Sequence, residues 1–206
     1  MKEKKTEVIL IRHGETEWNQ SGKFQGNIDI NLNEEGKKQA DILASYFKKN
    51  KFDRIYSSPL TRSLTTAQKI ASYHSSEVIK LSSIREFDFG DWEGSDYNEI
   101  RNKYPDLVEQ WYQNPESVEI PRGENLDEFQ KRVKNGFNEI ISGNQGNKII
   151  VVTHGGVIRI WISYLLNIPY KSFFKIEIDN ASISKVIYYE DYPILNSLNQ
   201  SVQNKI

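Results

Sequence analysis

The sequence predicts an α/β protein: a three-layer α/β/α arrangement in which helices cover both faces of a mostly parallel central sheet. Residues 8–11 and 149–152 are uninterrupted runs of Val, Ile and Leu. A strand without polar alternation is typical of a parallel sheet that is buried on both faces. Segments with the apolar spacing of helices lie between the predicted strands, and this alternation gives right-handed crossovers in one sheet.

Strands are expected in five places along the chain: residues 8–11, 54–56, 78–81, 149–152 and 183–189. The first and fourth are continuous apolar runs, which favours strands that are buried on both faces. The polar segment from Asp191 onward has no such pattern, and we expect it to fray.

Helices are expected between the strands, and three of them have clear start signals. Asn33 can cap a helix over 34–48, and Ser58-Pro59 predicts an N-cap with Pro at the first helical position of a helix to about Tyr73. Asn125 and Glu128 have capping-box spacing at the start of a helix to Ile141. We also expect a helix at 96–103 and an apolar helix after the glycine pair, at 157–166.

Length and composition favour a single soluble globular domain. The 206 residues carry 27 basic and 28 acidic side chains, so the net charge is −1. This balance gives no field that would attract nucleic acid or an anionic membrane, and we expect neither as a partner. We expect a single domain over 1–206, with an irregular excursion around 88–123 that covers a site.

The absence of cysteine excludes disulfides, thiol nucleophiles and cysteine-bound metals. The apolar run after the N-terminal lysines is too short for a signal peptide, and no segment reaches the ~20 apolar residues of a membrane span. We therefore expect a cytoplasmic protein.

The two continuous apolar strands are both followed by histidine and glycine, at residues 12–14 and 154–156. Ligands bind beyond the carboxyl ends of strands in open α/β sheets, so these residues are expected to meet. Arg62 follows the end of a third strand. Arginine forks, glycine backbone and a helix N-terminus together suit a phosphate.

The following segments then carry a resemblance: RHGETEWN (12–19), GKFQG (22–26), LNEEG (32–36), SSPLTR (57–62), EFDFGDWEG (86–94), PRGE (121–124) and VTHGGVIR (152–159). In this order they resemble the motifs of the histidine phosphatase superfamily, whose fold is also called phosphoglycerate-mutase-like. The resemblance spans nearly the whole chain.

The resemblance implies a role for each matched residue. His13 would be the nucleophile that takes the phosphoryl group as phosphohistidine, and Glu86 would protonate the leaving oxygen. Three side chains would clamp the phosphoryl oxygens: Arg12, Arg62 and His154.

Further contacts to the substrate phosphate are implied for Asn19 and for the backbone N–H of Gly155. Gln25 would either contact the substrate or shape its own loop. The resemblance implies neither a metal nor a cofactor, and the partner is a small phosphomonoester substrate.

Several simpler interpretations stand beside these. Asp88, Asp91 and Glu93 compete with Glu86 for the acid role, and only the position in the motif favours Glu86. A metal site built from His13, His154 and Glu86 is disfavoured because two nearby arginines would repel a divalent cation. For the aromatic residues, a place in the core is favoured over the mouth of a site; these are Trp18, Phe24, Trp92, Trp111 and Tyr112.

Hydrolysis is favoured over two alternatives. A cofactor-dependent phosphoglycerate mutase is disfavoured because Phe87 follows Glu86 where mutases carry arginine, and because the chain lacks the longer insert of mutases. The Phe-Gly-Asp-Trp-Glu-Gly run resembles the phosphatase branch, which includes α-ribazole phosphatases and broad-specificity phosphatases. A non-catalytic phosphate-binding module is disfavoured because every catalytic position is filled.

Overall fold

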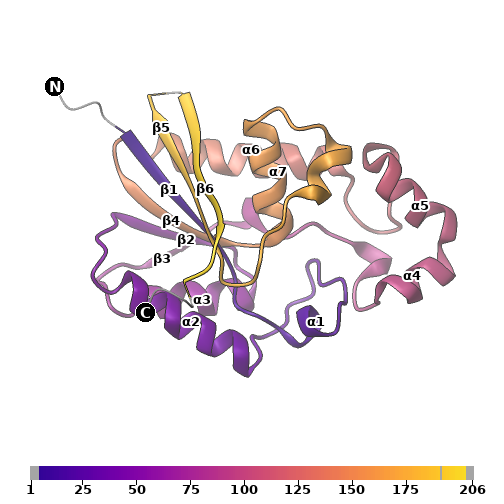
Figure 1. Ribbon diagram of the computed structural model, residues 1–206, viewed down its shortest axis with the longest axis horizontal. Helices are drawn as coiled ribbons and strands as arrows, with labels where there is room; N and C mark the ends of the chain where they lie inside the picture. The colour runs from indigo at the N-terminus through magenta and orange to yellow at the C-terminus, as the bar shows by residue number, and fades with distance from the viewer. Residues whose placement is uncertain (1–4, 191, 203–206) are drawn as a thin grey trace.

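The computed structural model describes residues 5–190 and 192–202, and within them one sheet of six strands forms the centre of the molecule (Figure 1). The strand order is β3-β2-β4-β1-β5-β6. The strands are β1 (Lys5–Arg12), β2 (Arg54–Ser57), β3 (Val78–Lys80), β4 (Lys148–Thr153), β5 (Ile183–Tyr189) and β6 (Tyr192–Gln200). The first four are parallel to one another, whereas β5 and β6 are antiparallel additions at one side.

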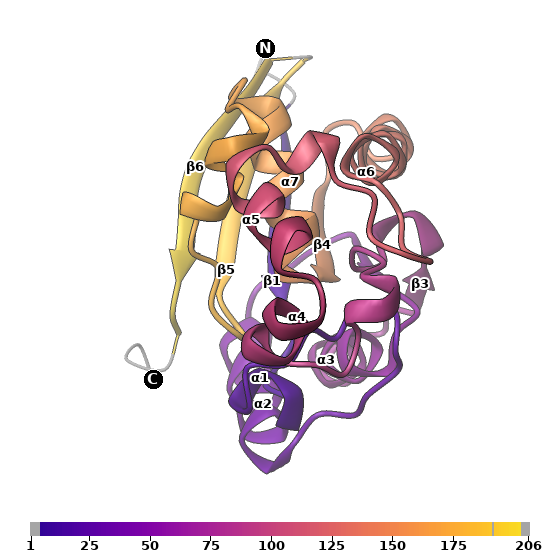
Figure 2. The ribbon, with the colours of Figure 1, turned by 90° about the vertical axis from the view of Figure 1, so that its right-hand side faces the viewer.

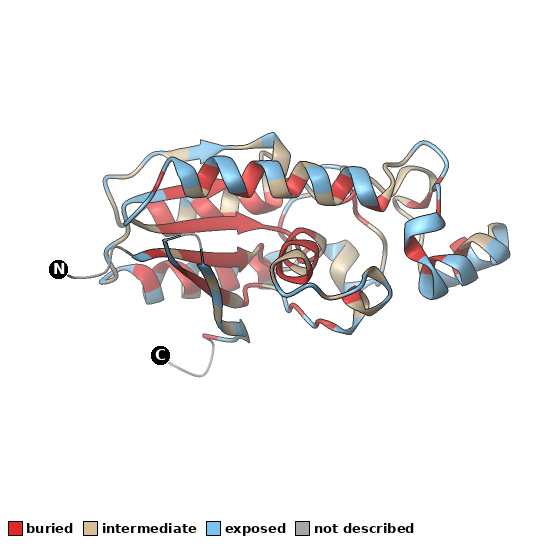
Figure 3. Cartoon of the chain, turned by 90° about the horizontal axis from the view of Figure 1, so that it is seen from above, coloured by how far each residue is buried: buried red, intermediate tan, exposed pale blue. Residues whose placement is uncertain are grey.

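Helices cover both faces of this sheet, which confirms the predicted mostly parallel α/β/α fold. One face is covered by α2 (Glu34–Phe47) and α3 (Thr61–Ala71), and the other by α6 (Leu126–Ser142) and α7 (Gly155–Leu165). Each face has its own hydrophobic cluster, one with Leu43 and Ile70 and the other with Phe137 and Trp161. In Figure 3 the central strands and α7 are the most continuously buried elements.

The capping signals at Asn33 and Asn125 were predicted correctly. The Asn33 side chain accepts from the backbone N–H of Gly36, and Asn125 forms a capping box with Glu128. Both caps place a polar side chain on backbone donors that have no partner inside the helix.

The predicted start of α3 is wrong. Its N-cap is Leu60, which makes no side-chain cap, and Ser58 and Pro59 precede the helix. The Ser58 hydroxyl instead contacts Nε2 of His154 at 2.8 Å and accepts from the Leu60 N–H. Ser58 therefore supports the site rather than the helix.

The predictions for the two C-terminal elements also need correction. Helix α7 starts at Gly155 rather than after the glycine pair. The segment from Tyr192 to Gln200 does not fray: it is the edge strand β6, paired with β5. Asp191 itself lies outside the described residues.

The excursion around 88–123 contains more regular structure than its sequence predicts. It holds α4 (Tyr97–Lys103) and α5 (Pro105–Gln113), with the 3₁₀ turns η2 (Gly90–Trp92) and η3 (Pro115–Ser117). Figure 2 shows α4 and α5 standing in front of the carboxyl ends of the central strands. The other short elements are η1 (Ser82–Ile84), η4 (Tyr170–Lys175) and α1 (Glu17–Gln20).

Within residues 5–190 and 192–202, no helix has both the length and the hydrophobicity that crossing a membrane requires.

Candidate active site

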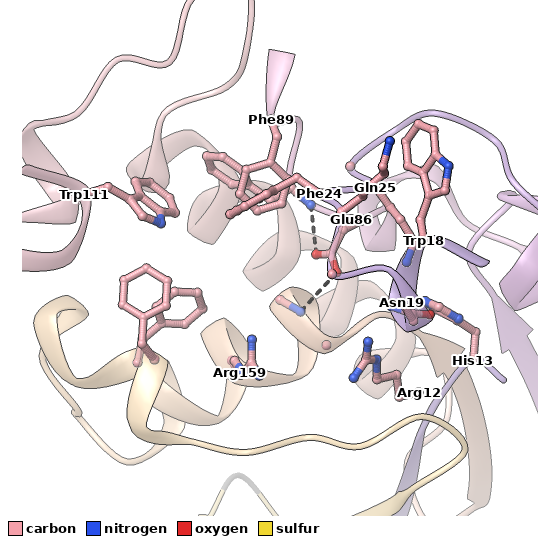
Figure 4. Close-up of a pocket in the computed structure, with 18 of the residues that line it drawn as sticks. Arg12, His13, Trp18, Asn19, Phe24, Gln25, Glu86, Phe89, Trp111 and Arg159 are labelled. Carbon is pink, nitrogen blue, oxygen red and sulfur yellow. Dashed lines mark hydrogen bonds between the residues drawn. The ribbon is translucent and has the colours of Figure 1, made fainter. Parts of the chain in front are cut away.

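A pocket of about 490 Å³ lies at the carboxyl ends of β1 and β4, against the first turn of α7 (Figure 4). Seven of the eight predicted site residues line it: Arg12, His13, Asn19, Gln25, Arg62, Glu86 and Gly155. They come from segments that are far apart in the chain, so the sheet topology brings them together as predicted.

The backbone around His13 is fixed by the sheet. The His13 N–H donates to the Thr153 carbonyl, and its own carbonyl accepts from the Ala181 N–H. The next residue must be glycine, because a Cβ on Gly14 would lie 2.4 Å from the Gly36 carbonyl oxygen. This contact packs the loop after β1 directly on the start of α2.

The His13 ring has one defined tautomer. Its Nδ1 lies 2.7 Å from the Gly14 carbonyl oxygen, which can only accept, so Nδ1 carries the proton and Nε2 carries the lone pair. Burial, and then the charges of Arg62 and Arg12, hold the pKa of His13 well below its ordinary value. His13 is therefore a neutral imidazole with an available Nε2.

His154 is fully buried and is not among the residues that line the pocket. Its ring centroid lies 5.2 Å from that of His13, in an edge-to-face arrangement. Its Nε2 contacts the hydroxyls of Ser58 and Ser63 at 2.8 and 3.3 Å, while its Nδ1 is buried without a partner. Burial is also the main cause that lowers the pKa of His154 well below its ordinary value.

Arg12 and Arg62 are held by backbone carbonyls rather than by acids. Nη1 of Arg12 donates to Ile178, and the Nη atoms of Arg62 donate to Ile28 and Gly26. The Nε of each guanidinium is buried without a partner. Burial lowers the pKa of Arg12 to about 10, so both arginines remain cations at neutral pH.

Asn19 presents donors to the pocket. Its Oδ1 accepts from the backbone and the hydroxyl of Thr16 and from the Asn180 amide. No hydrogen bond among the described residues uses its Nδ2. The oxygen is thus fully occupied, and the amide nitrogen is the group left for a ligand.

Gln25 and Gly155 also provide groups that have no protein partner. Gln25 is buried, and its Oε1 has no hydrogen bond among the described residues. Gly155 is the first residue of α7, and the first N–H groups of a helix have no partner inside it. Helix N-termini of this kind bind anions.

Glu86 is the only carboxylate among the residues that line the pocket. Its two oxygens accept from the backbone N–H groups of Phe87 at 2.9 Å and Gly156 at 3.1 Å, as the dashed lines of Figure 4 show. A Cβ at position 156 would lie 2.3 Å from Oε1 of Glu86, so a larger residue there would displace this carboxyl group from its position.

The competitors of Glu86 lie outside the pocket lining and have other partners. Glu93 accepts from three backbone N–H groups, those of Asn27, Ile28 and Phe89. Asp91 pairs with Arg122, and Asp88 accepts from the Gly90 N–H.

The sequence interpretation missed Arg159 and most of the aromatic wall. Arg159 lines the pocket one helical turn after Gly155, and this i,i+4 spacing within the motif is the signal that could have found it. Of the five aromatic residues that we expected in the core, only Trp92 lies there without lining the pocket; Trp18, Phe24, Trp111 and Tyr112 line it. Trp111 belongs to the core, since only 2% of it is exposed, and it also lines the pocket.

Comparison with known proteins decides the family. The sequence model described as "Histidine phosphatase superfamily (branch 1)" matches residues 8–201. The chain belongs to the histidine phosphatase superfamily.

Relatives of this histidine phosphatase agree with the assignment. It is 38% identical over 192 residues to phosphoserine phosphatase 1 of Hydrogenobacter thermophilus, covering 93% of this chain and 91% of that protein. A mutant phosphoserine phosphatase of Entamoeba histolytica, solved in complex with phosphoserine, is 35% identical with a TM-score of 0.87, covering 98% of this chain and 100% of that one. A putative α-ribazole-5′-phosphate phosphatase of Escherichia coli is 27% identical with a TM-score of 0.87, covering 95% and 96% of the chains. The chain is a phosphatase, with the phosphoglycerate-mutase-like fold that its motifs predict.

Among the described residues of this histidine phosphatase, no group of three His, Asp or Glu side chains is arranged to hold a metal ion.

The two buried histidines predict how the stability of this histidine phosphatase depends on pH. Because their folded-state pKa values are depressed, the unfolded state binds more protons below about pH 6.5, so stability falls as the pH falls. Between pH 6.5 and 5.5 each histidine should remove about 1 kcal/mol from the free energy of unfolding. Urea denaturation at both pH values measures the loss, and His154→Asn should reduce it by about half. A loss of equal size in His154→Asn would show that His154 does not contribute to it.

Proposed function

We propose that the protein hydrolyses a small phosphomonoester through a covalent phosphohistidine on His13. The observation that carries this proposal is the fixed tautomer of His13, with Nδ1 on the Gly14 carbonyl and an unprotonated Nε2 in a cationic pocket. The phosphoserine and α-ribazole phosphate named for the relatives are small phosphomonoesters, which is consistent with this substrate class.

In the first step, Nε2 of His13 attacks phosphorus and the bond from phosphorus to the leaving oxygen breaks. Glu86 enters this step protonated and gives its proton to the leaving oxygen, so the product departs as a neutral alcohol. Glu86 is the one acidic side chain among the residues that line the pocket, which supports this role.

In the second step, water attacks the phosphohistidine and the carboxylate of Glu86 takes the proton from that water. The bond between phosphorus and Nε2 breaks, its electron pair returns to the imidazole, and inorganic phosphate leaves. His13 and Glu86 then have their starting protonation states, so the cycle closes.

The phosphoryl oxygens are bound by donors that the protein leaves unpaired. Arg12 and Arg62 supply the charge, and the amide nitrogens of Asn19 and Gln25 and the Gly155 N–H supply neutral donors. The unpartnered Nδ1 of His154 completes this set if the Ser58 hydroxyl donates to Nε2, which leaves the proton on Nδ1.

No metal is needed in this scheme. The arginines around the pocket supply the positive charge that a metal would give, and they would repel a divalent cation.

Two assays on the purified protein test the proposal. We expect phosphate release from phosphoserine or phenyl phosphate that survives EDTA treatment without loss of rate. We also expect 2- and 3-phosphoglycerate to be interconverted more slowly than phosphate is released from them. Faster interconversion would make the protein a mutase, and activity that EDTA abolishes and zinc restores would overturn the metal-free mechanism.

A further inference from the structure

The pocket has a second end, away from His13, whose wall is aromatic. Six rings line it: Phe24, Phe89, Trp111, Tyr112, Phe173 and Phe174. Several of these rings contact each other edge to face: the centroids lie 4.9 Å apart for Phe24 and Phe89 and 5.5 Å apart for Trp111 and Phe174. A phosphoryl group cannot use this wall, so the wall is available to the leaving group of the substrate.

Arg159 is a cation between the two ends. Figure 4 shows it rising from α7, with Arg12 on one side and Trp111 on the other. Its Nε donates to the Ile176 carbonyl at 2.7 Å, which fixes the direction of the guanidinium. Its two terminal nitrogens have neither a hydrogen bond nor an ion pair among the described residues.

Arg132 is a useful comparison with Arg159, because it is a partly buried arginine with a structural role. All three of its nitrogens are occupied, by the Glu124 carboxylate and by the carbonyls of Ser83, Arg85 and Glu86. Arg159 is also partly buried, and burial is the main cause that lowers its pKa, yet its fork has no partner. The terminal nitrogens of Arg159 are not among the buried polar atoms that lack a partner, so they are open to the pocket, where a ligand can reach them.

The side chains that line the pocket carry more positive than negative charge, so the pocket can bind an anionic group in addition to the phosphate. Four cationic side chains line it, namely Arg12, Lys23, Arg62 and Arg159, against the single carboxylate of Glu86. Because Glu86 is protonated when the substrate binds in the proposed first step, a phosphomonoester dianion neutralises only two of the four positive charges. Positive charge therefore remains, and Arg159 carries part of it in front of the aromatic wall.

We infer that Arg159 is a specificity residue that binds a carboxylate on the leaving group, while a ring-sized apolar part of that leaving group packs on the aromatic wall. This inference rests on the proposed function and names its substrate class: the phosphate ester of a hydroxy acid with an apolar body. The guanidinium fork pairs with both carboxylate oxygens, which a neutral group of the same size cannot reproduce.

Two matched esters test the charge preference. 3-Carboxyphenyl phosphate and 3-carbamoylphenyl phosphate have nearly the same size and differ in one negative charge. We expect wild type to prefer the carboxylate ester by about tenfold in kcat/KM, mainly through KM. In Arg159→Gln this ratio should fall to about one, and in Arg159→Lys it should be intermediate. Arg122→Gln is the matched control, since Arg122 is exposed and lies outside the pocket lining, and it should keep the wild-type ratio.

Binding of the corresponding benzylphosphonates, measured by calorimetry, keeps the test independent of turnover. Absence of hydrolysis for every ester would overturn the proposed function, whereas equal Kd values for the carboxylate and carbamoyl phosphonates would overturn this inference alone. An Arg159→Gln variant that slows both esters equally and shifts both pH profiles would show that Arg159 acts through Glu86, which also overturns it.

The aromatic wall has its own test. Phe174→Leu removes one ring face and should lower kcat/KM for the aryl esters by about fivefold, with less effect on phosphoserine, which has no ring. Equal losses on aryl esters and on phosphoserine would show that the leaving group does not use the wall.

Discussion

Replacement of His13 by alanine should abolish phosphate release, lowering kcat by at least about four orders of magnitude. The reason is chemical: in the proposed mechanism His13 is the nucleophile, and no other histidine is among the residues that line the pocket. Rapid quenching of wild type with ³²P-labelled substrate should trap a protein-bound phosphoryl group that is stable in base and labile in acid, as expected of a phosphoramidate. His13→Ala should show no such label.

His74→Ala is the matched control for this prediction. His74 is the one histidine of the three in this chain that has no predicted role at the site. Its ring packs on Phe52, and its Nε2 contacts the Phe47 carbonyl. It is not among the residues that line the pocket. We expect this variant to keep both the label and the turnover. If His13→Ala retained more than about a hundredth of the wild-type rate, or if the label formed without His13, the covalent mechanism would be wrong.

The second large effect concerns the proton donor. Glu86→Gln should lower kcat by about 10²- to 10⁴-fold on alkyl esters such as phosphoserine. On 4-nitrophenyl phosphate the loss should stay within about tenfold, because that leaving group departs without a proton. Steady-state kinetics on both substrates give this split directly.

Asp88→Asn is the matched control, because Asp88 lies two residues away and outside the pocket lining. It should reduce both substrates equally or not at all. A leaving-group split in Asp88→Asn, or equal losses on both substrates in Glu86→Gln, would move the acid role away from Glu86.

The site was largely predictable from the sequence because its residues follow strands whose character is local. The apolar runs of β1 and β4 could be recognised without knowing their neighbours, and residues placed just after parallel strands meet at one edge of the sheet. His13, Arg62 and Gly155 therefore converge for a topological reason. Glu86, by contrast, was preferred to Asp88, Asp91 and Glu93 only by its position in the motif, and the structure adds that those three have backbone and arginine partners outside the pocket lining.

What the sequence did not predict depends on tertiary contacts. Ser58 has the sequence preference of an N-cap, but its hydroxyl is used by His154. Strand β6 alternates between half-buried and exposed residues and contains Asn, Ser and Gln, so only its pairing with β5 makes it a strand. Arg159 could be placed in the pocket only once α7 was known to begin at Gly155, since a shift of two residues turns a helical side chain by about half a turn.

The central position of β1 has a consequence for biosynthesis. Its hydrogen-bonded neighbours, β4 and β5, begin at Lys148 and Ile183, so β1 pairs only with strands that are synthesised much later. A nascent chain that stops before β4 already contains His13, Arg62 and Glu86 but lacks both partners of β1. Enzymatic competence should therefore arrive abruptly once β4 and β5 have been made, and the earlier segments must stay soluble until then.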